Sequence, residues 1–266
     1  MSAAENLFRE GDLTGSLHEL ENEIRRKPAD AKLRIFLSQL LMVRGDWDRA
    51  LNQLTVVGEM EASALPMMHT YQAAIQCERL RESVFNGERS PLIFGEPEPW
   101  IAQMVQALVL DGKGQSKEAA AMRAEAREAA PAVPGTLNGK PFEWVADADS
   151  RLGPILEVLL NSAYYWIPFS RIQRIVFEKP TDARDLVWLP AQFTWANGGE
   201  AMGLIPTRYA GSHRSEDDQI RLSRKTEWRE IAPEEYAGLG QRLLTTNADE
   251  LGLLEVRELT LETVGS

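Results

Sequence analysis

The sequence lacks the features that mark secreted, membrane-spanning and nucleic-acid-binding proteins. Its 266 residues include one cysteine, Cys77, so no disulfide can form within the chain, as is typical of a reducing compartment. Residues 1–12 hold no basic segment followed by an apolar run. No stretch approaches the roughly 18 consecutive apolar residues that a membrane span needs. We therefore expect a cytoplasmic protein without a membrane partner.

Basic residues are also in short supply. Lys and Arg total 29 against 40 Asp and Glu, which gives a formal net charge of −11. A chain with this charge repels a phosphate backbone. Nucleic acid is therefore not expected as a ligand.

The motifs of common catalytic sites are missing as well. There is no Gly-x-Ser-x-Gly sequence, and the segment 112–114 lacks the Lys-Ser/Thr end of a phosphate-binding loop. Cys77 lies among apolar residues of a predicted helix, where a thiol is usually inert packing. The three histidines, His18, His69 and His213, have no cysteine or second histidine nearby, so no zinc site is predicted. We expect a protein that is not an enzyme and has no metal or cofactor.

A repeat organises the N-terminal half. Gly11-Asp12-Leu13 recurs as Gly45-Asp46-Trp47, and this separation of 34 residues is the tetratricopeptide period. The register continues, since Leu20 aligns with Leu54. In such a repeat the Gly-Asp pair ends one helix and caps the next. The pattern predicts three to four helical hairpins over residues 1–130.

Stacked hairpins leave a concave face, which commonly holds a peptide or a helix. The predicted second repeat carries an apolar stripe at helical spacing, formed by Leu33, Phe36, Leu37, Leu40 and Leu41. Arg34 and Gln39 lie beside this stripe and are our candidates for polar contacts with a partner. The alternatives are that these helices only pack against one another, or that a groove involving the C-terminal sheet holds the partner.

The character of the sequence changes after residue 130. Residues 131–141 contain three prolines and two glycines and predict an interdomain linker. Strand patterns follow, with hairpins over 154–167 and 185–205, the second carrying the Asn197-Gly198 turn signal. A short helix is predicted over 233–244. We expect an α+β protein whose residues 142–266 form a small mixed β-sheet or partly open barrel with short helices, folding separately from the helical domain.

Aromatic and charged residues between Trp144 and Trp228 form an unusually specific series. It reads EWVADADSRLGPILEVLLNSAYYWIPFSRI, then DLVW, GLIPTRY and RKTEW. This series resembles the signature of the ImpE family, also called TagJ or SciE-type proteins, over residues 142–230. The resemblance implies an accessory role in bacterial type VI secretion, in which a contractile cytoplasmic sheath is assembled and recycled by a AAA+ ATPase. It implies binding to a helix of the small sheath subunit and, through the sheath, an indirect link to the ATPase.

The signature residues mark the family, and we expect them to build the C-terminal core. They include Trp144, Asp147, Asp149, Arg151, Tyr165, Trp166, Trp188, Arg208, Tyr209 and Trp228. Asp147 and Asp149 could share a divalent metal in a hydrolase, but buried carboxylates are more commonly paired with arginine. We expect a buried Arg208 to form a bidentate pair with one of them. A general tetratricopeptide adaptor or chaperone is the other alternative function.

Overall fold

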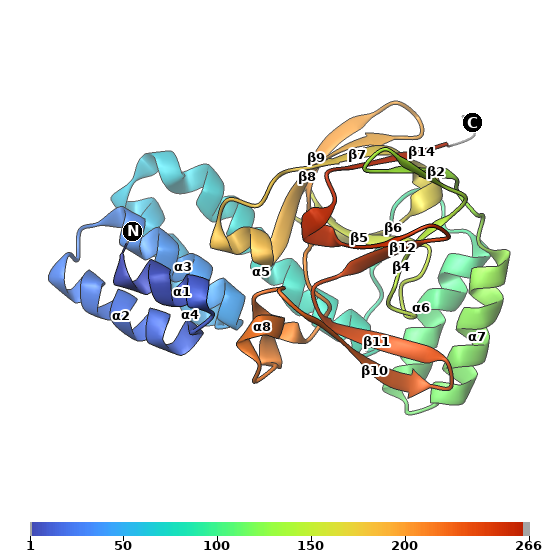
Figure 1. Cartoon of the computed structure of the whole chain (residues 1–266), viewed down its shortest axis with the longest axis horizontal. Helices are drawn as coiled ribbons and strands as arrows, with labels where there is room; N and C mark the ends of the chain where they lie inside the picture. The colour runs from blue at the N-terminus through green and yellow to red at the C-terminus, as the bar shows by residue number, and fades with distance from the viewer. Residues whose placement is uncertain (1, 263–266) are drawn as a thin grey trace.

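The N-terminal helices form two packed pairs (Figure 1), as seen in the computed structural model, which describes residues 2–262. The pairs are α1 (Ala3–Glu10) with α2 (Leu13–Arg26), and α3 (Ala31–Arg44) with α4 (Trp47–Met60). Gly11 and Gly45 end α1 and α3 in the left-handed conformation, with φ of 93° and 78°. Asp12 then caps α2 by accepting from the Gly15 amide at 2.7 Å. The repeat predicted from the Gly-Asp pairs is confirmed, although Asp46 makes no side-chain cap to α4.

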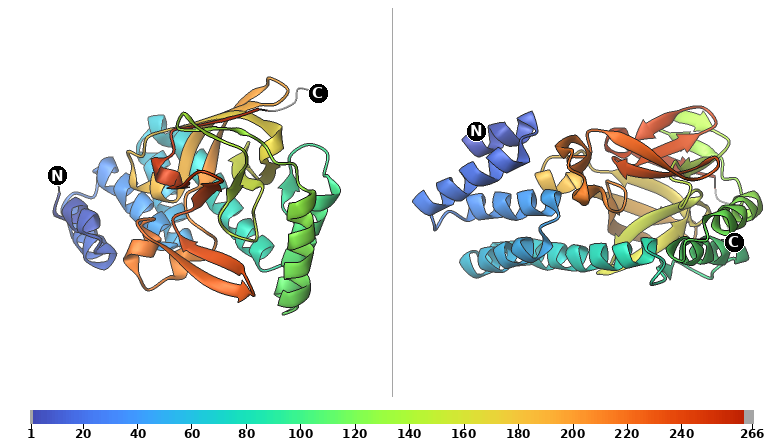
Figure 2. Two further views of the ribbon diagram at one scale, coloured as in Figure 1. Left: turned by 45° about the vertical axis from the view of Figure 1, so that its right-hand side comes forward. Right: turned by 90° about the horizontal axis from the view of Figure 1, so that it is seen from below.

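A single long helix, α5 (Leu65–Phe85), follows in place of another regular hairpin. It runs from the N-terminal helices to the β-sheet, and Figure 2 shows it beneath both parts of the molecule. A last helical pair, α6 (Pro99–Gly112) and α7 (Ser116–Ala129), lies at the opposite side from α1 and α2. The helices therefore flank the sheet from two directions.

The main sheet has nine strands in the order β1-β6-β5-β9-β8-β7-β14-β2-β3. Its strands are β1 (Leu92–Ile93), β2 (Gly135–Leu137), β3 (Lys140–Phe142), β5 (Ile155–Leu160), β6 (Ala163–Pro168), β7 (Ile172–Phe177), β8 (Trp188–Trp195), β9 (Glu200–Pro206) and β14 (Glu258–Leu261). Only the β1–β6 pair is parallel. Both predicted hairpins are confirmed as β5–β6 and β8–β9. The expected α+β class is correct.

Two smaller sheets complete the C-terminal part. One has the order β13-β12-β4, from β4 (Val145–Asp147), β12 (Leu243–Thr246) and β13 (Glu250–Gly252). The other is the hairpin of β10 (Thr226–Ala232) and β11 (Glu235–Gly240). A short helix, α8 (Asp218–Arg221), lies close to this hairpin in sequence and packs near β11.

Two sequence-based predictions are wrong at the level of secondary structure. Residues 233–244, predicted as a helix, form β11 and the start of β12. Gly240 has a φ of 90°, which a right-handed helix does not use. A Cβ there would lie 1.9 Å from the Lys225 carbonyl oxygen, so the glycine lets the two backbone segments lie close together. Residues 131–141, predicted as a linker, contain β2 and most of β3. Pro141 lies in β3 at the edge of the sheet, where a missing amide donor is tolerated, and Pro131 and Pro134 precede β2.

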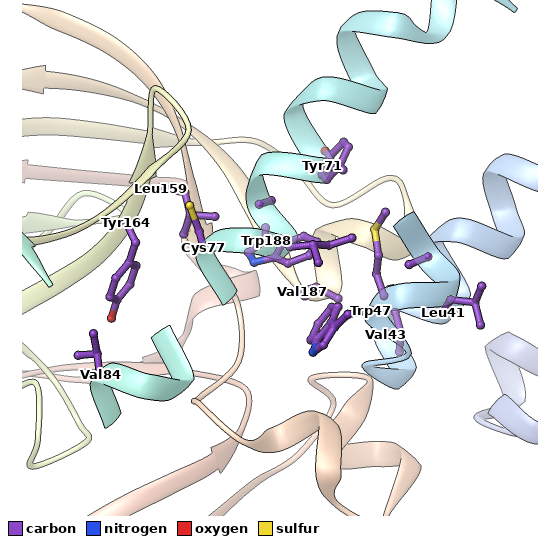
Figure 3. Close-up of a cluster of buried hydrophobic side chains, with 14 of the residues drawn as sticks. Leu41, Val43, Trp47, Tyr71, Cys77, Val84, Leu159, Tyr164, Val187 and Trp188 are labelled. Carbon is purple, nitrogen blue, oxygen red and sulfur yellow. The ribbon is translucent and has the colours of Figure 1, made fainter. Parts of the chain in front are cut away.

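The hydrophobic core does not divide at the predicted linker. One cluster fills one face of the main sheet, with Leu156, Ile175, Phe193 and Leu259 among its members. The other cluster begins in the N-terminal helices, follows α5 and continues onto the sheet. Figure 3 shows this second cluster, in which Trp47 and Tyr71 lie on either side of Trp188. Within residues 2–262, no helix combines the length and apolar character needed to cross a bilayer.

We therefore propose that residues 1–130 and 142–266 form one cooperative unit. A fragment of residues 1–130 is expected to aggregate, or to lose its helical signal on heating without a sharp transition. The reason is that Trp166 and Trp188, which complete the core of these helices, are absent from the fragment. Circular dichroism and size-exclusion chromatography of the fragment beside the whole chain would measure this. A monomeric fragment with a cooperative melt would show instead two separate domains.

Candidate functional site

A network of buried ions joins α5 to the sheet. Glu157 of β5 is fully buried, and its two carboxylate oxygens accept from Nε and Nη2 of Arg81 at 2.6 and 2.9 Å. Arg81 also donates to Glu78, one turn earlier in α5, at 3.0 Å. Tyr164 donates its hydroxyl to Glu157 as well. Each charge in this cluster thus has an opposite partner, as buried charges require.

The surroundings shift the pKa values of these groups. Burial raises the pKa of Glu157, but the guanidinium groups of Arg81 and Arg242 outweigh that effect and lower it to about 2. Burial next to this carboxylate raises the pKa of Tyr164 well above its ordinary value. Glu157 is therefore ionised, and Tyr164 is a neutral hydrogen-bond donor, at neutral pH.

The paired aspartates of the signature are held by two different arginines. Both Nε and Nη2 of Arg242 donate to Oδ2 of Asp147, at 2.9 and 2.6 Å. Arg151 forms a bidentate pair with Asp149, at 2.9 and 2.6 Å. The remaining oxygen of Asp147 accepts from the Asp149 amide. Burial raises the pKa of Asp147 to about 6, which still leaves it ionised beside Arg242 at neutral pH.

This arrangement supports a structural role for Asp147 and Asp149. All four of their carboxylate oxygens already accept hydrogen bonds, including one from the Gly238 amide at 2.9 Å. A metal ligand would need a free lone pair directed at a shared position. Within residues 2–262, no three histidine, cysteine or acidic side chains are grouped in a way that could hold a metal ion.

The expected pairing of Arg208 with these aspartates is wrong, although the residue is buried as expected. Its Nη1 donates to the Val43 and Arg221 carbonyl oxygens at 2.6 and 2.7 Å, and Nη2 donates to Met42 at 3.0 Å. Met42 and Val43 lie in the last turn of α3, where carbonyls carry partial negative charge, and the Met42 oxygen also accepts from the Gly45 amide at 3.1 Å. Burial lowers the pKa of Arg208 to about 10. Arg208 therefore fastens the C-terminal part to α3.

The other signature residues divide between the interior and the surface. Trp166 and Trp188 are buried, and their indole nitrogens donate to Tyr164 and Glu78 at 2.8 and 3.2 Å. Tyr209 is buried and accepts from the Leu243 amide at 3.0 Å. The remaining aromatics reach solvent: Tyr165 is half-buried, Trp144 is 38% exposed and Trp228 is 39% exposed.

A groove opens between the N-terminal helices and the C-terminal part. It has a volume of about 700 Å³ and lies between α1, α3 and the short 3₁₀ helix η3 (Ala183–Leu186). Its apolar residues are Phe8, Ile35, Phe36, Pro180, Ala183 and Leu186, and its charged residues are Glu5, Arg9, Lys32 and Asp182. An apolar floor between charged rims suits an amphipathic helix.

The two predicted partner-binding residues lie on different sides of α3. Gln39 lines the groove and is 7% exposed, and its amide atoms still reach solvent. Arg34 does not line the groove. Its guanidinium donates to the Pro28 carbonyl and to Gln53 of α4, at 3.1 and 3.3 Å.

Sequence reasoning missed Glu78, Arg81 and Arg242. Glu78 and Arg81 are one helical turn apart in α5, between the apolar residues Ile75 and Val84. Charged residues on the apolar face of a helix are a signal of a buried ion pair. Arg242 carries no comparable signal, because it lies between two strands.

Comparisons with known proteins agree with the resemblance seen in the signature. The family model described as ImpE protein matches residues 139–260. The type VI secretion system accessory component TagJ of Pseudomonas aeruginosa is 52% identical over 259 residues, which cover 97% of this chain and 91% of that protein. The crystal structure of protein VPA1032 from Vibrio parahaemolyticus aligns with a TM-score of 0.89 and 25% identity, over 99% of this chain and 98% of that chain. The similarity therefore includes the helical part as well as the sheet.

Arg208→Ala is expected to lower the free energy of unfolding by about 3 kcal/mol, because buried carbonyls lose a charged donor. The matched control is Arg224→Ala, since Arg224 also donates to the last carbonyls of a helix, Phe8 and Arg9 of α1, but is exposed. The control should lose less than about 1 kcal/mol. Urea denaturation would measure both, and equal losses would argue against the assigned role of Arg208.

Glu157→Gln is expected to show a pH-dependent loss of stability. The folded pKa of about 2 lies below the ordinary value of 4.5, so the ionised carboxylate stabilises the fold above pH 4.5, and this contribution is lost as pH falls towards 2. The variant should therefore be about 3 kcal/mol less stable than the wild type at pH 7 and much closer to it at pH 3. Chemical denaturation at both pH values tests this; an unchanged difference would mean that Glu157 does not titrate as proposed.

Proposed function

The chain belongs to the ImpE family of type VI secretion accessory components, and from this premise we propose that it binds a helix of the small sheath subunit in the groove between α1, α3 and η3. It then acts as a non-enzymatic adaptor in the cytoplasm, where it influences assembly of the sheath or its presentation to the AAA+ ATPase. The accessory role follows from family membership, and the groove supports the partner and the site.

The observation that carries this site is the position of Gln39 in the groove. Its amide reaches solvent in the free protein, so it is available to donate to or accept from a polar group of a partner. Gln39 lies in the groove, next to apolar side chains of α1, α3 and η3. A partner helix can cover those side chains and present a polar group to Gln39. Binding there exchanges contacts of the amide with water for contacts with the partner.

Ile35 is a side chain of the apolar floor that is free to make new contacts. Phe8, Phe36 and Leu186 are partly buried against the main core and contribute to the fold. Ile35 lines the groove, is half-buried and does not belong to that core. Covering Ile35 would therefore contribute to binding without any repacking of the protein.

Isothermal titration of the full chain with a peptide containing the helix of the cognate small sheath subunit should give micromolar affinity, about −8 kcal/mol. Ile35→Glu is expected to weaken binding by about tenfold or more, because it places an unpaired charge in an apolar contact. Met60→Glu is the matched control, since Met60 is exposed at the end of α4 and does not line the groove.

Arg34→Ala distinguishes the groove from the other side of α3, and it should leave binding unchanged. If Arg34→Ala weakens binding and Ile35→Glu does not, the helix binds on the α3–α4 face and the groove assignment is wrong. Absence of binding between the full chain and every sheath-subunit segment would contradict the proposed function itself.

A further inference from the structure

A second cleft lies far from the groove, where the C-terminal end of α5 meets the β10–β11 hairpin. One hollow of about 320 Å³ lies between α5, β11 and the 3₁₀ helix η4 (Ser212–Arg214). An adjoining hollow of about 670 Å³ extends towards the turn between α6 and α7. The two hollows share Phe85, Asn86, Arg151 and Arg229, so they form one continuous cleft.

Three guanidinium groups line the first hollow, from Arg151, Arg214 and Arg229. Arg151 uses Nε and Nη2 for Asp149, and its guanidinium carbon lies 4.7 Å from the centre of the Phe85 ring. Its Nη1 has no hydrogen-bond partner within residues 2–262. The guanidinium of Arg229 also has no hydrogen-bond or ion-pair partner among these residues. Donors from two arginines are therefore available to a ligand.

The acidic residues of the cleft do not cancel this positive charge in the first hollow. Glu82 is the acidic residue lining it, and its carboxylate oxygens lie 3.0 Å from His213 and 3.0 Å from Arg214. In the adjoining hollow, Asp111 pairs with Arg123, while Glu88 and Glu230 add negative charge. The cleft is thus positive at the α5–η4 end and acidic towards α6 and α7.

We propose that the first hollow binds a carboxylate side chain from an acidic segment of a protein partner. Arginine guanidinium groups match a carboxylate with paired hydrogen bonds. Phe85, Ala237 and Leu239 add apolar surface for the methylene groups of such a side chain. Although the chain carries a net charge of −11, the guanidinium groups of Arg151 and Arg229 give this hollow a local positive charge that selects a carboxylate. This site goes beyond the proposed sheath-helix groove and does not depend on it.

The probe is a blocked tri-glutamate peptide, titrated into the full chain at low salt because exposed ion pairs are screened. A blocked tri-glutamine peptide and inorganic phosphate serve as comparison ligands. Tri-glutamate should bind, and Arg229→Gln should weaken it by about fivefold, the effect of one largely exposed ion pair. Arg174→Gln is the matched control, because Arg174 is an exposed strand arginine that pairs with Glu258 outside the cleft.

Several results would overturn the proposal. Equal weakening by Arg174→Gln would indicate general charge attraction, and equal binding of tri-glutamine would remove the role of the carboxylate. Phosphate binding at the same affinity, with the same dependence on Arg229, would make this a phosphate site. No binding of tri-glutamate would also contradict the proposal.

The melting temperature of Arg229→Gln should match the wild type, and its binding of the sheath peptide should be unchanged, which separates this site from the groove.

Discussion

The buried ion pair between Arg81 and Glu157 is the interaction on which the arrangement of the two parts depends. Removing both charges from water is costly, and the cost is offset only when helix and strand meet in one geometry. Arg81 also donates to the Arg208 carbonyl oxygen at 3.0 Å, and the Arg208 side chain in turn holds the end of α3. This chain of contacts sets the position of the N-terminal helices relative to the sheet.

The proposed binding groove is a consequence of that position. A tetratricopeptide-like array by itself leaves its concave face open. Here η3, stabilised by a capping box between Asp182 and Asp185, closes one side of the face presented by α1 and α3. The site therefore needs the N-terminal helices together with residues 180–186, which are far apart in sequence. The family signature contributes mainly by building the support for this groove.

Much of the fold is predictable because local rules agree with it. The Gly-Asp pairs predict the helical repeat, and the Asn-Gly turn predicts the β8–β9 hairpin. The pairing of arginines with acids is not predictable, since several of each are buried together and Arg208 selects backbone carbonyls instead. The prolines of 131–141 also mislead, because Pro131 and Pro134 precede β2 and Pro141 lies in the edge strand β3, which tolerates it. The place of Gln39 beside an apolar stripe makes it a candidate from the sequence, whereas η3 carries no such signal.

The central claim is that α5 and the sheet form one cooperative unit, and native-state hydrogen exchange of the intact chain tests it most directly. Backbone amides in the second half of α5 and in β5 should open with the same free energy as denaturant is added, equal to that of global unfolding. The contrary result is an opening of α1 to α5 at lower free energy while β5 and β9 stay protected. That outcome would mean that the Arg81–Glu157 pair does not join the two parts.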